Sequence, residues 1–171
     1  MEAPRMSPKL RQLNVTYVPE EDRLLLKVST SDDQEYRAWC TRRFVRLLLD
    51  RLEILFESEV TETQVVPQEV RKDVAQLKHR DAVTEQAFTK PYEAEPVSYP
   101  LGESGILLTQ LSYREKDGGH VTMALSGSGG KGVTLNMDSK LQHHFYEIMS
   151  RACQRAGWFE EKDQGGKPVV H

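Results

Sequence analysis

The longest stretch with unbroken helical periodicity runs from Asp32 to Glu57. No Gly or Pro interrupts it before Ser58, and Asp32 and Glu35 have the spacing of a capping box at its start. At about 100° per residue, its apolar side chains cover an arc of roughly 200°, wider than the stripe of an ordinary surface helix. We therefore expect a central helix that is covered on two sides, by a sheet and by a second helix or a partner chain.

One tryptophan lies on the charged face of this predicted helix. Trp39 is expected next to Arg43, four residues further on, so that a guanidinium group can stack on the indole ring. Arg42 and Arg46 belong to the same face. Two interpretations stay open. Either a loop folds over Trp39 while the arginines pair with nearby acids such as Asp50, or the Trp and Arg side chains form a binding hot spot for a partner.

Length and composition favour one globular domain. The chain has 171 residues, of which 38% are hydrophobic and 29% charged. Its net charge of −3 gives no general attraction to nucleic acid or to anionic membranes. The sequence has no apolar run long enough to cross a membrane and no apolar core of a secretory signal near its start. We therefore expect a cytoplasmic protein in which Cys40 and Cys153, each inside a predicted helix, are buried and reduced.

Alternating apolar residues predict a β-hairpin before the central helix, with strands near residues 13–17 and 24–28. After the central helix, Pro67 suits the first turn of a second helix, which is expected to end near Gln86.

A proline-rich loop is then predicted from Phe88 to Gly102. We expect its Tyr92 and Tyr99 to dock on the domain, and this loop to be the segment that covers Trp39.

Three further strands and a helix complete the predicted fold. The strands are expected near residues 106–113, 121–125 and 133–137, and the helix begins at Asp138 or Ser139 and ends at Gly157. Each strand has one apolar and one polar face, which is typical of an antiparallel sheet with helices on one side. The predicted class is α+β, a two-layer sandwich of about five strands in the order ββα-α-βββα. Residues 9–159 would form this single domain, residues 1–8 a flexible arm and residues 160–171 a disordered tail.

The motifs associated with chemistry are incomplete. The glycine-rich segment Gly127–Gly132 has neither the spacing nor the following helix of a phosphate-binding loop. His143 and Glu147 are four residues apart on a helix, but a third zinc ligand is not evident, so a solvated helix face is the expected interpretation. Signatures of a Ser or Cys nucleophile are absent as well. We therefore assign no catalytic residue, metal or cofactor.

The leading hypothesis is a non-enzymatic protein-binding or assembly module. Its contact surface would be the Trp39, Arg42, Arg43 and Arg46 face or the open face of the sheet, and self-association is a further form of it. One alternative is a single-stranded nucleic-acid-binding protein, since the repeated strand–helix units resemble Whirly-type proteins in element order alone. The net charge counts against that alternative. Another is a small-molecule-binding domain with its pocket between the Tyr92 and Tyr99 loop and the helices.

Overall fold

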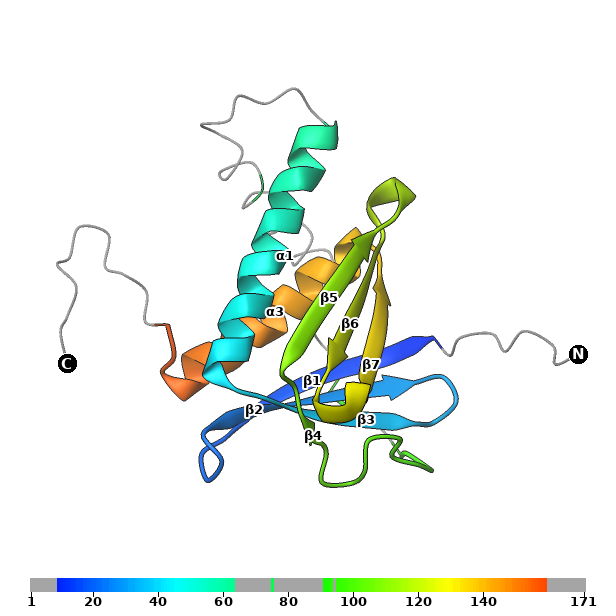
Figure 1. Ribbon diagram of the computed structural model, residues 1–171, viewed down its shortest axis with the longest axis vertical. Coiled ribbons are helices and arrows are strands. Elements are labelled where there is room, and N and C mark those ends of the chain that lie inside the picture. Colours follow the sequence, from blue (N-terminus) through cyan, green and yellow to red (C-terminus); the bar gives the residue numbers. More distant parts are fainter. Residues whose placement is uncertain (1–8, 64–74, 76–90, 94, 160–171) are drawn as a thin grey trace, which may run out of the picture.

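The computed structural model describes residues 9–63, 75, 91–93 and 95–159, and it has the mixed α+β architecture that the sequence predicts (Figure 1). Its strands are β1 (Leu10–Val18), β2 (Arg23–Thr30), β3 (Glu35–Cys40), β4 (Ile106–Leu107), β5 (Gln110–Glu115), β6 (Val121–Ser126) and β7 (Gly132–Met137). The helices are α1 (Arg42–Thr63) and α3 (Ser139–Ala156). The predicted second helix between Pro67 and Gln86 lies outside the described residues except for Ala75, which is helical and buried. The expected arm and tail, residues 1–8 and 160–171, lie outside them entirely.

The strands form two sheets instead of the single predicted one. The first sheet has the order β1-β2-β3-β4 and the second the order β5-β6-β7. Neighbouring strands are antiparallel, except that β4 runs parallel to β3. In Figure 1 the strands of the second sheet run steeply across those of the first.

The predicted start of the central helix is wrong, because Glu35–Cys40 form strand β3. Asp33 takes a left-handed conformation, with φ of 58°, and its amide donates to the carbonyl of Thr30 at 3.1 Å. The chain thereby turns back, and β3 pairs with β2 along its whole length. Helix α1 begins only at Arg42. Thr41 caps it, because its hydroxyl accepts a hydrogen bond from the Phe44 amide at 3.2 Å. The capping box expected from Asp32 and Glu35 therefore does not form.

One continuous core joins the two sheets to both helices. Buried apolar residues come from β2, β6, β7, α1 and α3, including Leu26, Leu125, Leu48 and Phe145. Helix α3 packs along β1 and also contacts α1 and β7, so it bridges the sheets. Within the described residues, no helix is long and apolar enough to cross a membrane.

The last helix follows its sequence signals closely. Asp138 caps α3 by accepting a hydrogen bond from the Leu141 amide at 2.8 Å, and Gly157 ends the helix with φ of 69°. Trp158 is buried, and its ring meets the ring of Tyr17 edge-on at 5.8 Å. The predicted boundaries of this helix are confirmed.

Both cysteines are free and buried, although Cys40 lies on β3 rather than on a helix. Burial raises the pKa of the Cys40 thiol to about 12 and that of Cys153 to about 11. Both thiols are therefore neutral at physiological pH and behave as small apolar side chains.

A candidate binding groove between the two sheets

Trp39, the predicted centre of a binding face, contacts its own chain. Its indole N–H donates to the Ser104 carbonyl at 2.7 Å, and its side chain is only partly exposed. Ser104 lies just beyond the loop that was expected to cover Trp39. Because Trp39 is on β3, it does not share a helix face with the arginines of α1.

The three arginines of the predicted face lie together on the first turns of α1 and are all exposed. Arg42 and Arg46 place their guanidinium carbons 5.4 and 4.7 Å from the centre of the Phe159 ring. This cation–π stacking ties the start of α1 to the segment that follows α3.

Tyr92 and Tyr99 dock on the domain, as the sequence predicts, but against β3 rather than over the helices. The Tyr92 hydroxyl donates to Glu35 Oε2 at 2.8 Å, and the Arg37 guanidinium carbon lies 4.6 Å from the centre of the Tyr99 ring. Glu35 is only 2% exposed, and its other oxygen accepts from Arg37 Nε at 2.6 Å. The hydrogen bond to Glu35 raises the pKa of Arg37, and burial raises that of Tyr92.

His143 is not on a solvated helix face, so that expectation is wrong. It is 2% exposed and stacks on Phe56, with the ring centres 3.9 Å apart. Its Nε2 lies 3.4 Å from Glu59 Oε2, and Glu59 also accepts from the Ser139 hydroxyl at 2.5 Å. Glu147 instead pairs with Arg151 at 2.9 Å. In the described part of the chain, three or more His, Cys, Asp or Glu side chains do not gather in a way that could hold a metal.

The best candidate site is a groove of about 840 Å³ between the two sheets, which we call the inter-sheet groove. One wall comes from the first sheet and the residue before it: Lys9, Leu10, Val28, Thr30 and Tyr36. The other comes mainly from β7, with contributions from β6, the turn that precedes β6 and the start of α3. Neither wall contains a residue that the sequence singled out as a binding candidate.

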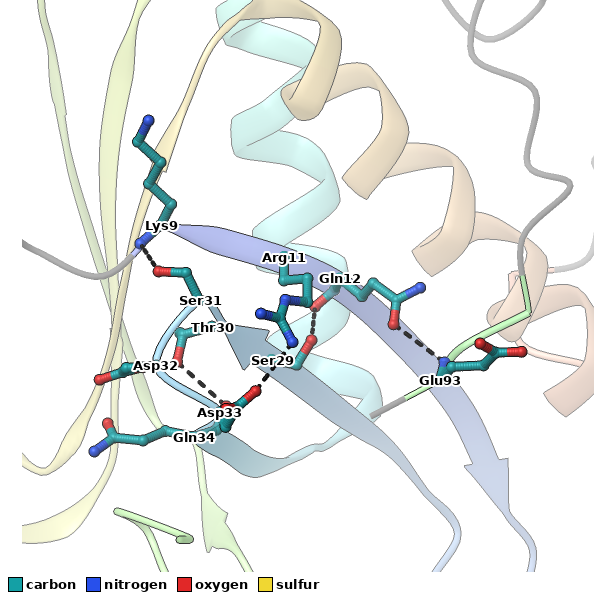
Figure 2. A network of polar contacts seen from close by, with 10 residues as sticks. All are labelled: Lys9, Arg11, Gln12, Ser29, Thr30, Ser31, Asp32, Asp33, Gln34 and Glu93. Atoms are coloured by element: carbon teal, nitrogen blue, oxygen red, sulfur yellow. Dashed lines mark hydrogen bonds and ion pairs between the residues drawn. The ribbon is translucent and has the colours of Figure 1, made fainter. Parts of the chain in front are cut away.

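A polar network fixes the first wall (Figure 2). The Lys9 amide donates to the Ser31 hydroxyl at 3.0 Å, and the Ser31 amide donates back to the Lys9 carbonyl at 2.8 Å. The Thr30 hydroxyl bonds the Asp32 carboxylate, and Arg11 forms an ion pair with Asp33 at 3.0 Å. These contacts hold the start of β1 against the β2–β3 turn, so the wall has a defined position before any ligand binds.

Strand β7 supplies the second wall along its whole length, since all six of its residues line the groove. The Gly127 amide bonds the Lys131 carbonyl at 2.8 Å, and the β6–β7 register continues from there without a shift. Hydrogen-bonded pairs alternate along an antiparallel ladder, so the backbone groups of Val133, Leu135 and Met137 bond to β6. Those of the alternate residues, Gly132, Thr134 and Asn136, point away from β6. Within the described residues no other strand pairs with β7 on that side.

The groove has a local positive charge although the whole chain is negative. Lys9, Lys116 and His120 line it and are exposed, whereas Asp138 is its one acid. The Asp138 carboxylate already accepts the capping hydrogen bond from the Leu141 amide. Two lysines therefore face the groove against one acid that is engaged in capping a helix.

Comparison with protein-family models, curated proteins and solved structures found no match. The alternating pattern of residues 133–137 does predict strand β7, but a pattern within one strand does not show which strand ends at the edge of a sheet. Sequence reasoning therefore missed the groove, because its walls come from segments that are far apart in the chain.

Proposed function

We propose that this protein is a non-enzymatic binding or assembly module, and that another protein binds in its inter-sheet groove. One observation carries the proposal: the groove runs along a strand edge whose outward backbone groups meet no strand in the described part of the chain. Such an edge is a template for pairing with another chain. A cytoplasmic location belongs to the same proposal.

The groove also has the form of a binding site. Its volume is within the range of about 300–1,000 Å³ that is usual for ligand sites. Its first wall is fixed by the network around Lys9 and Ser31, so binding need not order that wall. The row of backbone groups on β7 suits an elongated polypeptide better than a compact small molecule.

Partner capture with two matched variants tests the proposal. Thr134 is exposed on β7 and lines the groove, whereas Ser112 is exposed on β5 and does not. The amount of partner captured by the full chain should fall at least tenfold with Thr134→Trp. With Ser112→Trp it should stay at the level of the unaltered chain. Equal retention by both variants would show that the groove is not the contact site.

Single-stranded nucleic acid is the second candidate, favoured by the lysines of the groove and by Tyr36 on its first wall. It predicts that a labelled oligothymidylate binds with an affinity that falls steeply with salt. Replacing Lys9 and Lys116 together by Glu should abolish that binding. A salt-independent signal, or one that persists in the double variant, would rule this candidate out.

A further inference from the structure

We propose that the inter-sheet groove binds an extended, acidic segment of the partner, which adds to β7 as a fourth strand of the second sheet. This inference rests on the proposed function and specifies the chemistry of its partner.

The geometry of β7 supports strand addition. The backbone N–H and C=O groups of Gly132, Thr134 and Asn136 point away from β6, and the groove borders all three residues. An added strand would lie about 4.8 Å from β7. The side chains of the intervening residues are buried in the core, so β7 cannot rotate to hide its outer edge.

The β7 edge lacks the features that protect other strand edges from pairing. Charged residues, proline and bulges usually serve this purpose. The sequence of β7 is GVTLNM, and its register with β6 has no shift. By contrast, the opposite edge of the same sheet is β5, which ends in the exposed charges Arg114 and Glu115. The two edges of this sheet therefore differ: β5 ends in charges that disfavour pairing with another strand, and β7 does not.

The charges around the groove indicate the chemistry of the added strand. Lys9 stands on the wall opposite β7, and Lys116 and His120 lie at the turn before β6. The single acid, Asp138, is bonded to the Leu141 amide. Carboxylates on an incoming strand would meet Lys9 and Lys116, whereas the one carboxylate that lines the groove, Asp138, lies just after β7 and caps α3.

A second copy of this chain fits less well. The β7 sequence GVTLNM has no carboxylate, so a β7 strand from another copy would bring no acid on the paired strand itself to meet Lys9 and Lys116.

The test uses the full chain and three labelled synthetic peptides of equal length. One alternates Val with Glu, one alternates Val with Lys, and the third is the Val–Glu peptide with N-methyl groups on alternate amides. We expect the Val–Glu peptide to bind at least tenfold more tightly than each of the other two. It should also slow hydrogen exchange of the Thr134 and Asn136 amides, because these would become donors to the added strand. Equal binding of the acidic and basic peptides, or protection elsewhere in the chain, would overturn the inference.

Two variants sharpen the result. Thr134→Pro removes an outward N–H without removing a bond to β6, and proline is tolerated at strand edges. Thr134→Pro should lower the affinity for the Val–Glu peptide at least tenfold. The Lys9→Glu chain should lose most of its preference for the acidic peptide over the basic one. If Thr134→Pro unfolds the chain, the N-methylated peptide still tests backbone pairing on the unaltered protein.

The outcomes separate this inference from the proposed function. If Thr134→Trp abolishes partner capture but the Val–Glu peptide binds no better than its controls, the groove is the site and the acidic-strand inference is wrong. If neither capture nor peptide binding depends on the groove, both are wrong. A peptide-independent dimer that forms through β7 would replace the acidic segment by a second copy of the chain.

Discussion

Strand β3 pairs with β2 on one side, and strand β7 pairs with β6 on one side. The opposite edges of these two strands differ in what covers them. The edge of β3 is closed by residues 97–108: the Glu35 amide bonds the Ser98 carbonyl at 3.1 Å, and the Leu108 amide bonds the Trp39 carbonyl at 2.9 Å. The edge of β7 has no such cover in the described part of the chain. Trp39, Tyr92 and Tyr99, the aromatic residues that stand out in the sequence, contact β3 or the segment that covers its edge, whereas Arg42 and Arg46 stack on Phe159. The candidate binding edge is β7, whose sequence GVTLNM contains no charged or aromatic residue.

Core substitutions in each sheet test whether the two sheets share one core. Leu26 of the first sheet and Leu125 of the second are both fully buried. We expect Leu26→Ala and Leu125→Ala each to lower the free energy of unfolding by about 2–5 kcal/mol, in a single urea transition. A much smaller loss for Leu125→Ala, or two separate transitions, would mean that the second sheet is a separate unit.

The closed edge depends on the contacts of Glu35. Arg37→Met removes the cation that pairs with this buried carboxylate, and the Arg37 side chain is itself 25% exposed. We expect a loss of about 3 kcal/mol, the lower end for breaking a buried pair. Tyr92→Phe should cost less, about 1.5 kcal/mol, because it removes one hydrogen bond to a charged group.

Chemical denaturation of matched variants checks this prediction. Adding Glu35→Gln to Arg37→Met should recover part of the loss, since the unpaired buried charge is then gone. On the open edge, Thr134→Ala should change stability by less than about 0.5 kcal/mol. If Arg37→Met is as mild as Thr134→Ala, the polar contacts do not hold the β3 edge closed.

The sequence predicted local structure better than it predicted the neighbours of each element. Helix α3 was found from Asp138 to Gly157 because its cap, its stripe and its stop residue are all local signals. The segment from Glu35 to Cys40 was misassigned, because Tyr36, Ala38 and Cys40 alternate as a strand but also extend the apolar arc of the following helix. Pairing with β2 decides between the two, and that contact is not visible in a helical wheel. The same holds for the groove, since sheet edges are a property of topology.

The junction between the closed edge and the β6–β7 hairpin depends on a glycine. A Cβ atom at Gly127 would lie 2.2 Å from the Leu107 carbonyl oxygen of β4, and backbone cannot move aside as a flexible side chain can. We expect Gly127→Ala to destabilise the fold by about 1–3 kcal/mol. Gly130→Ala is the control, because it meets no atom within 4 Å and suffers only from its φ of +75°, a cost of about 1 kcal/mol. Equal effects in thermal unfolding would show that β4 and the hairpin are not in close contact.

The smallest effect concerns α3, the helix that joins the two sheets. Burial, and to a lesser degree Arg151, lowers the pKa of His144 below its ordinary value of 6.5. Between the folded and unfolded pKa values the unfolded chain binds more protons, so stability is complete above about pH 6.5 and falls as the pH decreases below it. His144→Gln should make this part of the stability–pH curve shallower. Urea midpoints between pH 5 and pH 8 measure the difference. An unchanged slope in the His144 variant would show that this imidazole does not lose solvent on folding.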